Sequence, residues 1–369
     1  MKIIHLVLGK ANPNKGNGVN KLVHFLATSQ MNAGYDVEVW GITHNANVQH
    51  SHNYTLRLFK SSRFRFLLSR NFNKNLDSLK QECIFVLHSV FIPELYMASL
   101  YIRKYGYKYI HMPHDPYSKA MFGDRKLLKK LYWLLCEKKL LQNSSAIQTL
   151  DIRHNDLLKK LGISSRFISF PNGFNESDNI SEDELLFSKT GRIKCFYLGR
   201  LDIYNKGLDL LIEAFNNRDV SNIANLVIQG VGDLSKIRSI INKFKLRDII
   251  RVLPANFSTP PTSLIKNYNI FCLPSRFEGF GLAAMEAMLA ARVILVSEDA
   301  GIAKHIEKCG CGVLVQPQVN SIINGILKLS AIRSEWKKMG LAGRAYALQH
   351  FSMAELAKKI AIEYELVCK

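Results

Sequence analysis

The chain has 369 residues, a length that suits two ordinary domains better than one. Hydrophobic residues make up 47% and charged residues 22%, a globular composition that excludes disorder and supplies two hydrophobic cores. The 50 Lys and Arg outweigh the 30 Asp and Glu, and this net charge of +20 favours an anionic partner: a nucleotide, a nucleic acid or an anionic lipid.

Cysteine usage and hydropathy indicate a cytoplasmic protein. The seven cysteines are scattered, odd in number and without a C-x-x-C pair, which fits a reduced compartment. The apolar run Ile3–Leu8 is too short for a signal peptide and leads into a polar stretch. No run of about 18 uncharged apolar residues is present, so we expect no membrane-spanning helix.

Short β-branched runs alternate with longer helical patterns in the first half of the chain. Strands are expected at Ile3–Leu8, Val37–Ile42, Leu56–Phe59, Ile84–His88, Tyr107–Met112, Ala146–Leu150 and Phe167–Phe170. Helices are expected at Val19–Ala33, Pro93–Lys104, Arg125–Gln142 and Ile152–Leu161. Alternation of this kind predicts β-α-β units around a parallel sheet, whose strands are apolar on both faces.

The alternation pauses at a polar, acidic stretch and then resumes. Strands are expected next at Ile193–Leu198, Leu226–Gln229, Ile250–Leu253, Ile270–Leu273, Val293–Val296 and Gly312–Val315. Helices are expected at Gly207–Asn216, Leu234–Phe244, Leu282–Ala291, Ile302–Lys308 and Val319–Ser330, before an all-helical region, Glu335–Val367. The sequence therefore predicts an α/β chain with doubly wound parallel-sheet domains at 1–175 and 193–351, joined by a linker at 176–192.

Ligands of open α/β sheets bind at the carboxyl ends of the strands, so motifs that follow strands carry the most weight. KANPNKGNGVNK (Lys10–Lys21) follows the first strand, and Gly16 and Gly18 there allow an anion to approach the helix that begins next. The alternative interpretation is a flexible loop. YLGRLDIYNKG (Tyr197–Gly207) places Arg200 and Lys206 around one loop, which suits a diphosphate, although both could be solvated surface charges.

LPSRFEGFGLAAMEAM (Leu273–Met288) is the strongest motif. Glu278 precedes a helix that is apolar except for Glu286, and a carboxylate in such a helix is costly unless it is paired or faces a polar cleft. Two carboxylates eight residues apart could bind two diols, such as a sugar and a ribose; the alternative for Glu278 is a helix cap. HMPHDPY places His114 and Asp115 after another strand, although it could be an incidental turn. Neither a metal-ligand pattern nor a nucleophile elbow is evident.

Taken in order, these segments resemble the retaining GT-B glycosyltransferases of family four, also called glycosyl transferases group one. The resemblance is most specific within Phe196–Gln316, and Glu278 and Glu286 have the spacing of the family's Glu-x7-Glu signature. It implies the GT-B fold, with two Rossmann-like domains facing across a cleft. It also implies that the C-terminal helix, 352–369, crosses back and packs on the N-terminal domain.

The resemblance implies an acceptor-binding N-terminal domain and a donor-binding C-terminal domain. It assigns Arg200 and Lys206 to the donor diphosphate, Glu278 to hydroxyls of the transferred sugar and Glu286 to the ribose hydroxyls.

The remaining implied roles involve backbone groups and one histidine. N–H groups of Gly281 and Leu282 would add to the phosphate site, and Gly18 would close that site from the other domain. His114 would lie beside the sugar, near its C6 hydroxyl.

The implied reaction is metal-independent and needs no cofactor. A hexose moves from a nucleotide-diphosphate sugar to a hydroxyl of a glycan or lipid-linked acceptor, with retention, in bacterial surface polysaccharide synthesis such as that of lipopolysaccharide or O-antigen. The alternatives are a nucleotide-sugar 2-epimerase or a phosphorylase of the same fold, and a nucleic-acid-binding protein. Only the net charge suggests the last, and helix-turn-helix, zinc-finger and RNP signatures are lacking, so we expect no nucleic-acid partner.

The first half of the chain also suggests an anionic membrane surface as a partner. Residues 1–180 contain 25 basic and 12 acidic residues, a net of +13, which leaves 25 and 18, a net of +7, for the rest. Basic residues interleave with apolar ones in Ser61–Lys74 and Asp124–Leu140, as in helices that lie on anionic bilayers. We therefore expect a peripheral protein on the inner face of the plasma membrane. The alternative is that the leucines of the second stretch face the core.

Overall fold

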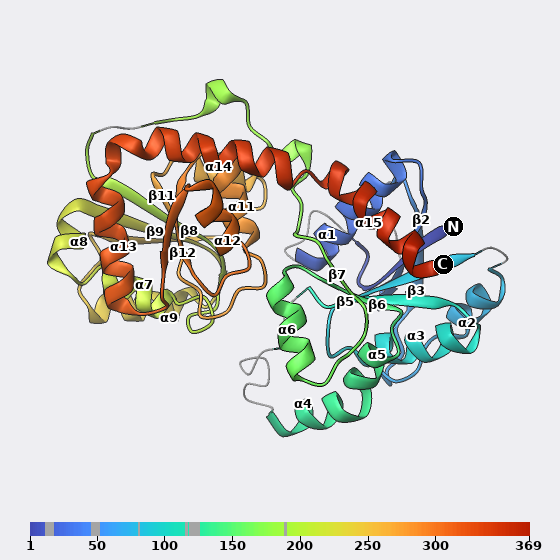
Figure 1. The fold of residues 1–369 in the computed structure, drawn as a ribbon. Helices are drawn as coiled ribbons and strands as arrows, with labels where there is room; N and C mark the ends of the chain where they lie inside the picture. Colours follow the sequence, from blue (N-terminus) through green and yellow to red (C-terminus); the bar gives the residue numbers. More distant parts are fainter. Residues whose placement is uncertain (12–17, 46–51, 80–81, 115–116, 118–125, 188–189) are drawn as a thin grey trace. The chain divides into compact units, whose positions relative to one another are not determined.

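The structure, a computed structural model, describes the chain except residues 12–17, 46–51, 80–81, 115–116, 118–125 and 188–189. The chain forms two compact units, each built on a parallel sheet of its own (Figure 1). Unit 1 comprises Met1–Gly173 with Met353–Lys369, and unit 2 comprises Phe174–Ser352.

Unit 1 contains a seven-stranded sheet with the order β3-β2-β1-β4-β5-β6-β7, in which every pairing is parallel. Its strands are β1 (Lys2–Leu8), β2 (Asp36–Thr43), β3 (Thr55–Lys60), β4 (Cys83–His88), β5 (Lys108–Met112), β6 (Ala146–Thr149) and β7 (Phe167–Ser169). The strand order reverses between β1 and β4. Strands β2 and β3 lie on one side of β1, and the chain then returns so that β4 to β7 lie on its other side. Strand β4 is buried along its whole length, as expected when helices cover both faces of a sheet.

The helices of unit 1 are α1 (Gly18–Asn32), α2 (Arg70–Asp77), α3 (Pro93–Lys104), α4 (Lys126–Tyr132), α5 (Lys138–Gln142), α6 (Ile152–Lys160) and α15 (Met353–Cys368). Three of them begin at residues that suit a helix start. Ser69 and Asp151 accept backbone N–H groups at the starts of α2 and α6, and Pro93 opens α3. The last helix, α15, packs against α1, so the end of the chain completes the unit that its beginning forms.

One predicted helix contains an irregular turn. The expected helix Arg125–Gln142 corresponds, over its described residues, to α4, a five-residue π-helical turn at Trp133–Glu137, and α5. A π-helical turn inserts an extra residue, which changes the side on which later residues lie. It lies where the helix buries Trp133 and Glu137.

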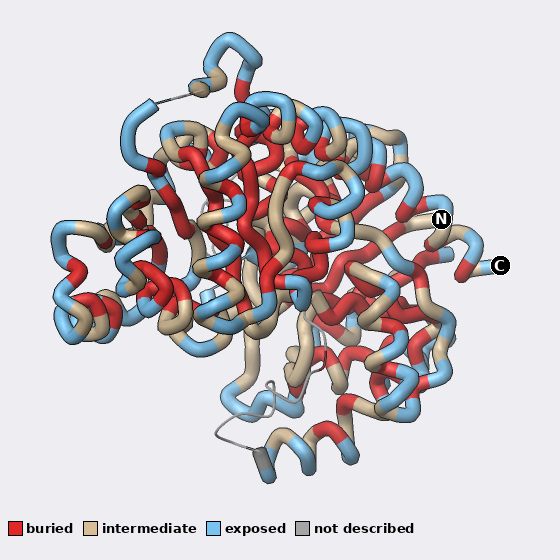
Figure 2. The backbone as a smooth tube through the Cα atoms, turned by 60° about the vertical axis from the view of Figure 1, so that its left-hand side comes forward, coloured by how far each residue is buried: buried red, intermediate tan, exposed pale blue. Residues whose placement is uncertain are grey.

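Unit 2 contains a six-stranded parallel sheet with the order β10-β9-β8-β11-β12-β13. Its strands are β8 (Ile193–Leu201), β9 (Ala224–Gly232), β10 (Ile250–Pro254), β11 (Ile270–Leu273), β12 (Val293–Ser297) and β13 (Gly312–Val315). Its helices are α7 (Leu208–Ala214), α8 (Arg218–Ile223), α9 (Leu234–Lys243), α10 (Pro261–Ile265), α11 (Leu282–Leu289), α12 (Ala303–Cys309), α13 (Val319–Ala331) and α14 (Trp336–His350). Figure 2 shows the strands buried and the outer turns of the helices exposed.

The acidic stretch before β8 is held by unit 2. Thr262 Oγ1 donates to the carbonyl of Asp178 at 2.7 Å, and the buried guanidinium of Arg292 donates to the carbonyl of Leu186 at 2.5 Å. Residues from Phe174 onward therefore group with unit 2, including the stretch that we expected to be a linker.

The order of each sheet is that of a doubly wound fold, as the alternating pattern predicts. The strand order reverses between β1 and β4 in unit 1 and between β8 and β11 in unit 2. Ligands of such sheets bind at the carboxyl ends of the strands beside this reversal. No helix among the described residues is both long enough and apolar enough to cross a bilayer.

Candidate functional site

The strongest sequence motifs follow β8 and β11, the two strands at the reversal point of unit 2. Arg200 is the penultimate residue of β8, and its carbonyl accepts the hydroxyl of buried Tyr197 at 2.7 Å. Its side chain is exposed and makes no hydrogen bond or ion pair with the rest of the described chain. The guanidinium is therefore available to a ligand at the carboxyl end of the sheet.

The turn after β8 brings Lys206 to the same edge. The Lys206 N–H donates to the carbonyl of Asp202 at 3.0 Å, and Asp202 also accepts the backbone N–H of Asn205 at 3.1 Å. Gly207 ends the turn with a φ of +64°, and a Cβ there would lie 2.1 Å from the carbonyl oxygen of Pro274. Only glycine lets this turn lie so close to the end of β11.

Lys206 and Glu278 form an ion pair across the two loops. Lys206 Nζ lies 2.8 Å from Glu278 Oε2, and both side chains are 15% exposed. Ser275 Oγ, in a fully buried residue, lies 3.4 Å from the same carboxylate oxygen. The structure thus brings together two of the predicted residues, a cation and a carboxylate that are only partly exposed to solvent.

Arg276 connects the two loops of this region, a role that the sequence motifs did not predict. Its guanidinium makes two hydrogen bonds of 2.7 Å to the carboxylate of Asp209 on α7 and donates to the carbonyl of Tyr204 at 2.8 Å. It also stacks over the Tyr204 ring. These contacts tie the loop after β11 to the loop after β8, so Arg276 holds Lys206 and Glu278 in register. The arginine within the strand-end motif could have suggested such a role.

Helix α11 begins at this edge, and the N–H groups of Gly281 and Leu282 at its start make no hydrogen bond with another described residue. Gly281 precedes it with a φ of +104°, and Leu282 is its first residue, so their N–H groups lie at the positive end of the helix. Glu286 follows one turn later and is half-buried, whereas the flanking Met285 and Ala287 are buried in the core. Anions bind readily at such helix starts.

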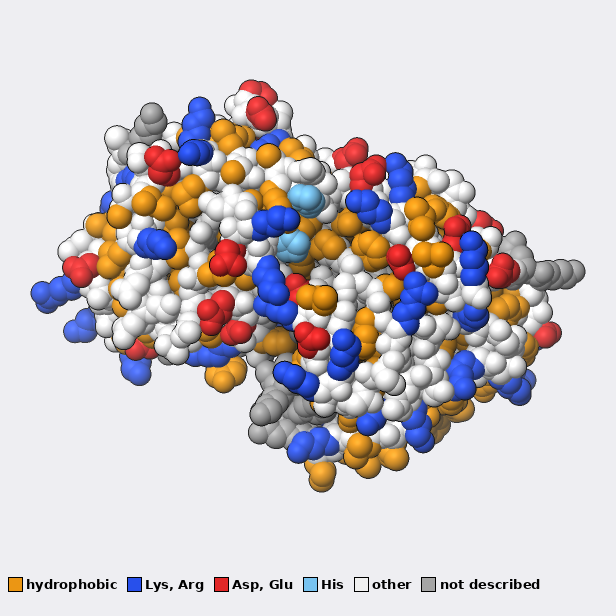
Figure 3. Space-filling view, viewed as in Figure 1, with side chains coloured by type: hydrophobic (Ala, Val, Ile, Leu, Met, Phe, Trp, Pro, Cys, Tyr) orange, Lys and Arg blue, Asp and Glu red, His pale blue; other side chains and the backbone are white. Residues whose placement is uncertain are grey.

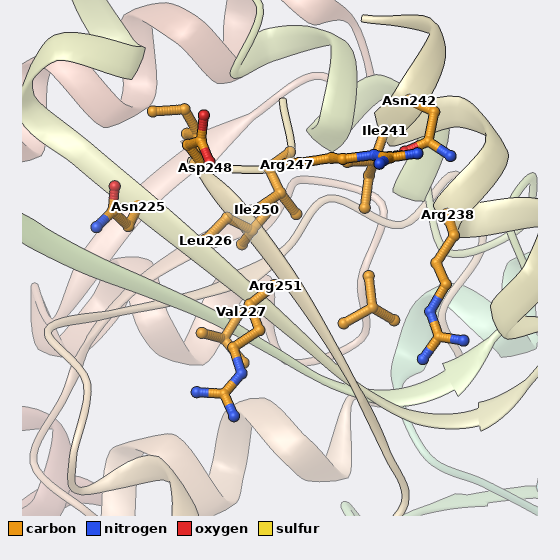
Figure 4. Close-up of a pocket in the computed structure, with 12 residues that line it drawn as sticks. Asn225, Leu226, Val227, Arg238, Ile241, Asn242, Arg247, Asp248, Ile250 and Arg251 are labelled. Carbon is orange, nitrogen blue, oxygen red and sulfur yellow. The ribbon is translucent and has the colours of Figure 1, made fainter. Parts of the chain in front are cut away.

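A hollow of about 580 Å³ in unit 2 lies away from these residues. Figure 4 shows the side chains that line it. Its lining comes from the amino-terminal halves of β9 and β10 and from α9, and includes Arg238, Arg247 and Arg251. This is the opposite end of the strands from Arg200 and Glu278. The three arginines are exposed, and the carboxylate of Asp248 shares the hollow with them. We therefore do not place the predicted diphosphate site in this hollow.

Unit 1 holds a chain of hydrogen-bonded histidines at the reversal point of its own sheet. Gln30 Oε1 lies 2.7 Å from His5 Nε2, His5 Nδ1 lies 2.9 Å from His88 Nε2, and His88 Nδ1 lies 2.9 Å from His114 Nε2. A neutral imidazole has one N–H and one lone pair, so each link fixes the tautomer of the next ring. With the Gln30 oxygen accepting, each ring donates through Nε2, which leaves His114 Nδ1 as an acceptor.

Burial keeps these histidines neutral. It lowers the pKa of His5 to about 4 and that of His114 to about 3, where the nearby His5 adds to the effect. His88, between them, is fully buried, and its pKa is also far below the ordinary value. His114 itself has a φ of +65°, and its Nδ1 has no hydrogen-bond partner among the described residues. His5 and His88 were missed, although a histidine within an apolar strand is itself a signal of a buried polar contact.

The motif Lys10–Lys21, here called the first-turn motif, is only partly described. Gly18 is the first residue of α1 and is exposed, whereas Gly16, and Asp115 of the HMPHDPY motif, lie outside the described residues. Asn20, near the start of α1, links this helix to the chain at the end of β1. Its side chain accepts the N–H of Ala11 at 2.8 Å and donates to the carbonyl of Leu8 at 3.2 Å. Within the described part of the chain, no three His, Cys, Asp or Glu side chains converge as metal ligands would.

Comparison with known proteins identifies both halves of the chain. Residues 179–346 match the model of glycosyl transferases group 1, and residues 16–178 match that of glycosyltransferase family 4. An uncharacterized glycosyltransferase of Methanocaldococcus jannaschii is 28% identical over 165 residues, which are 44% of this chain and 39% of that protein. The chain thus spans less than half the length of that relative.

Solved structures extend the likeness over the whole fold. HepE of Anabaena, in complex with UDP and glucose, is 15% identical, covers 99% of each chain and has a TM-score of 0.77. WaaG, a glycosyltransferase involved in lipopolysaccharide biosynthesis, is 15% identical, covers 97% of this chain and 98% of its own, and has a TM-score of 0.70. At these identities the likeness shows the fold, and it confirms the two Rossmann-like sheets with a C-terminal helix returning to the first. The chain belongs to the glycosyl transferases group 1 and has the GT-B fold.

Proposed function

We propose that the chain is a retaining glycosyltransferase that moves a hexose from a nucleotide-diphosphate sugar to a hydroxyl of a glycan or lipid-linked acceptor, without a metal ion. The observation that carries this proposal is the Lys206–Glu278 pair, 2.8 Å apart at the carboxyl ends of the strands where the order of unit 2 reverses. A cation for a diphosphate and a carboxylate for sugar hydroxyls are what such a donor needs. HepE, of the same fold, holds UDP and glucose, which supports a donor of this class.

The roles follow from the charges that develop during transfer. The bond between the anomeric carbon and the diphosphate breaks, and the acceptor hydroxyl forms the new bond on the same face of the sugar. Arg200, Lys206 and the N–H groups at Gly281 and Leu282 stabilise the leaving diphosphate. That diphosphate takes the proton of the acceptor hydroxyl, so no protein nucleophile or general base is assigned.

The remaining groups position the substrates. Glu278 accepts hydroxyls of the transferred sugar, and Glu286 accepts those of the ribose. In unit 1, the acceptor-binding unit, His114 lies near the C6 hydroxyl of the sugar and Gly18 closes the phosphate site.

The ion pair also distinguishes the intact donor from the nucleoside diphosphate that remains after transfer. Without a donor, Lys206 and Glu278 neutralise each other. A bound donor replaces both partners at once, because its diphosphate takes over the lysine and its sugar hydroxyls donate to the carboxylate. A nucleoside diphosphate without the sugar competes for Lys206 but leaves Glu278 without a compensating contact. The ion pair therefore favours binding of the intact donor over binding of the free nucleoside diphosphate, which helps release of that product.

The proposed setting is the synthesis of bacterial surface polysaccharide, in the cytoplasm and peripheral on the inner face of the plasma membrane. Residues 1–180 carry +13 of the net charge of +20, which supports attraction to an anionic surface. WaaG, whose fold the chain shares, is involved in lipopolysaccharide biosynthesis, which supports an acceptor of this class.

A ligand screen by thermal unfolding tests the proposal. UDP, GDP, ADP and their hexose conjugates are each added with and without EDTA, and a ligand at about 100 times its dissociation constant adds about 2.7 kcal/mol of stability. We expect one nucleotide series to stabilise the chain, EDTA to leave transfer intact, and NMR of the product to show the donor's anomeric configuration. Stabilisation by none of them, or activity that EDTA abolishes and Mn²⁺ restores, would contradict the proposal.

A further inference from the structure

Unit 1 exposes a row of leucines on α4 and the π-helical turn. Their exposed fractions are 80% for Leu127, 66% for Leu128, 52% for Leu131, 60% for Leu134 and 52% for Leu135. They recur at intervals of three and four residues and all five are exposed, whereas Trp133 and Glu137 of the π-helical turn are buried, so the leucines form one stripe on the solvent-facing side of the helical run. Single exposed leucines are ordinary on a protein surface, but a contiguous stripe of five marks an interaction site.

The leucines are not needed to hold this helical run in the fold, because its other side is anchored. Trp133 is buried and packs against the Tyr117 ring at 5.2 Å. Buried Glu137 accepts the Tyr117 hydroxyl at 2.7 Å and the backbone N–H of Phe91 at 3.1 Å. The run therefore has one side packed in unit 1 and a second apolar side that faces solvent. The alternative that these leucines belong to the core is wrong.

A neighbouring loop extends the apolar stripe. Phe64, Phe66 and Leu67 are 70%, 46% and 54% exposed. The Phe66 ring lies 6.3 Å from the ring of Tyr132 at the end of α4, so the loop and the helix are adjacent. Arg65, in the same loop, donates to both carboxylate oxygens of buried Glu94, at 2.9 and 3.0 Å, which holds the loop in place. We call the five leucines together with Phe64, Phe66 and Leu67 the leucine surface.

The charge around the leucine surface is positive. Residues 126–142 contain five lysines and one carboxylate, and that carboxylate, Glu137, is buried. In the space-filling view, hydrophobic side chains protrude along the α4 edge of unit 1 with Lys and Arg side chains beside them (Figure 3). Two copies of this chain meeting through the surface would bring their lysines together, which is electrostatically unfavourable. An apolar stripe bordered by lysines matches instead the boundary between anionic headgroups and acyl chains.

We propose that the leucine surface docks unit 1 on a bilayer of anionic phospholipid, with α4 lying in the plane of the interface. The inference deepens the peripheral membrane association proposed above and rests on it. The leucines and phenylalanines enter the acyl boundary, and the lysines contact the phosphate headgroups. Neither contribution suffices alone, because an apolar stripe of this length without charge attraction, or surface lysines without insertion, binds weakly and reversibly.

Vesicle co-sedimentation of the full chain tests the proposal. Vesicles of phosphatidylcholine alone are compared with vesicles that also contain phosphatidylglycerol, across a salt series. We expect binding to the anionic vesicles that decreases as salt rises. The combined variant Leu127→Gln, Leu131→Gln and Leu134→Gln should weaken that binding about a hundredfold, since three inserted side chains are lost. Glutamine keeps the helix propensity, so folding should persist, which the unfolding midpoint verifies.

Matched controls separate insertion from other effects. Leu100→Gln, Ile362→Gln and Leu366→Gln change three exposed aliphatic residues on other helices of unit 1, and should leave binding unchanged. Lys129→Gln, Lys130→Gln and Lys139→Gln should weaken binding to anionic vesicles about a hundredfold, whereas Lys236→Gln, Lys243→Gln and Lys245→Gln, with the same charge loss on unit 2, should have little effect. The single variant Leu131→Glu should weaken binding as well.

Three results would overturn the proposal. They are a wild-type chain that ignores anionic vesicles at low salt, a leucine variant that binds as the wild type does, and a wild-type dimer that the leucine variant converts to a monomer. Stabilisation by donor nucleotides is measured on the same variants. Vesicle binding without donor stabilisation would sink the proposed function and leave the docking surface in place.

Discussion

At the scale of single residues, Glu278 and Lys206 restrain each other in the free chain. In the variant Glu278→Gln, the ion pair is lost and Lys206 becomes available to the diphosphate. We expect the variant to bind the free nucleoside diphosphate at least as tightly as the wild type, and to transfer sugar about a hundredfold more slowly. Calorimetric titration and turnover measure the two effects. Equal losses in diphosphate binding and in transfer would refute this division of roles.

Glu286→Gln provides the matched comparison for Glu278→Gln. Ribose is present in both the intact donor and the free nucleoside diphosphate, so this variant should bind both ligands more weakly and by similar factors. The same calorimetric titrations measure it. A loss confined to the intact donor would move Glu286 from the ribose to the sugar.

The cations differ in what their removal does to the fold. Arg200→Ala removes an exposed side chain that makes no hydrogen bond or ion pair with a described residue, so stability should change little, while turnover should fall about a hundredfold or more. Lys206→Ala should lower turnover similarly and also lower the unfolding midpoint, because Glu278 is then a partly buried carboxylate without its cation. Lys266→Ala breaks another ion pair of unit 2, that with Glu184, and should keep full turnover. Unchanged turnover in Lys206→Ala would remove it from the site.

The histidine chain makes the stability of unit 1 depend on pH. His5 and His88 have pKa values well below the ordinary 6.5 in the folded chain, so the unfolded chain binds more protons once the pH falls below that value. Stability should therefore decrease as the pH falls from about 7 to about 5. In His88→Gln, one such proton is no longer taken up on unfolding, and the decrease should be smaller. Unfolding midpoints at the two pH values measure this, and equal decreases in both proteins would contradict it.

The predicted and missed residues differ in the kind of information that identifies them. Glu278 and Glu286 could be singled out because their spacing and their apolar surroundings are visible in the sequence. His5, His88 and Arg276 could not be placed, because their partners come from other strands and loops. A hydrogen bond between His5 and His88 spans 83 residues, and only the order of the strands brings the two rings together.

At the scale of elements, the turn between β8 and α7 depends on Gly207. Alanine there would need a φ of +64° and would also clash with the Pro274 carbonyl, 2.1 Å from its Cβ. Gly310 has a φ of +66° with nothing within 4 Å of the Cβ position, so Gly310→Ala has the same backbone strain without the clash. We expect Gly310→Ala to cost about 1–2 kcal/mol and to keep turnover. Gly207→Ala should cost more and should slow transfer, since the clash separates Lys206 from Glu278; equal effects would contradict this.

Strands were easier to predict than short helices. The apolar runs at β1, β4 and β11 differ from the predicted ranges by no more than a residue at either end, because a buried parallel strand is apolar throughout. Helices α2, α8 and α10 were missed. Helix α2 buries only Phe72 and Leu76, α8 buries only Val220, and α10 has five residues, so none of them leaves a clear helical period in the sequence.

At the scale of the whole molecule, the chain crosses between its units twice, and the second crossing could not be derived from periodicity. The helical pattern of residues 335–367 indicates helices but not their partners. The structure ends α14 at His350 in unit 2 and begins α15 at Met353 in unit 1. Only the family resemblance predicted this return. It matters because α1, which follows the first-turn motif and begins at Gly18, packs against α15.

Unit 1 should therefore lose stability when contacts of α15 are removed, while unit 2 should not. Tyr364 of α15 is fully buried, and its hydroxyl donates to Gln148 Oε1 on β6. Gln148 Nε2 already has no partner among the described residues. Tyr364→Phe would therefore leave both polar groups of the Gln148 side chain, Oε1 and Nε2, buried without hydrogen bonds. The expected cost is about 1–3 kcal/mol, confined to the unfolding of unit 1.

Tryptophan fluorescence can assign that cost to one unit. Trp40 and Trp133 lie in unit 1 and Trp336 lies in unit 2, so variants that keep a single tryptophan report each unit separately. The matched control is Tyr346→Phe, which removes a hydroxyl that lies 3.0 Å from His305 Nδ1 in unit 2. Tyr364→Phe should lower the denaturant midpoint reported by Trp40 and leave that of Trp336 unchanged, and Tyr346→Phe should do the opposite. If Tyr364→Phe shifted both midpoints equally, the two units would unfold as one cooperative body, and the return of α15 would stabilise the whole chain rather than unit 1.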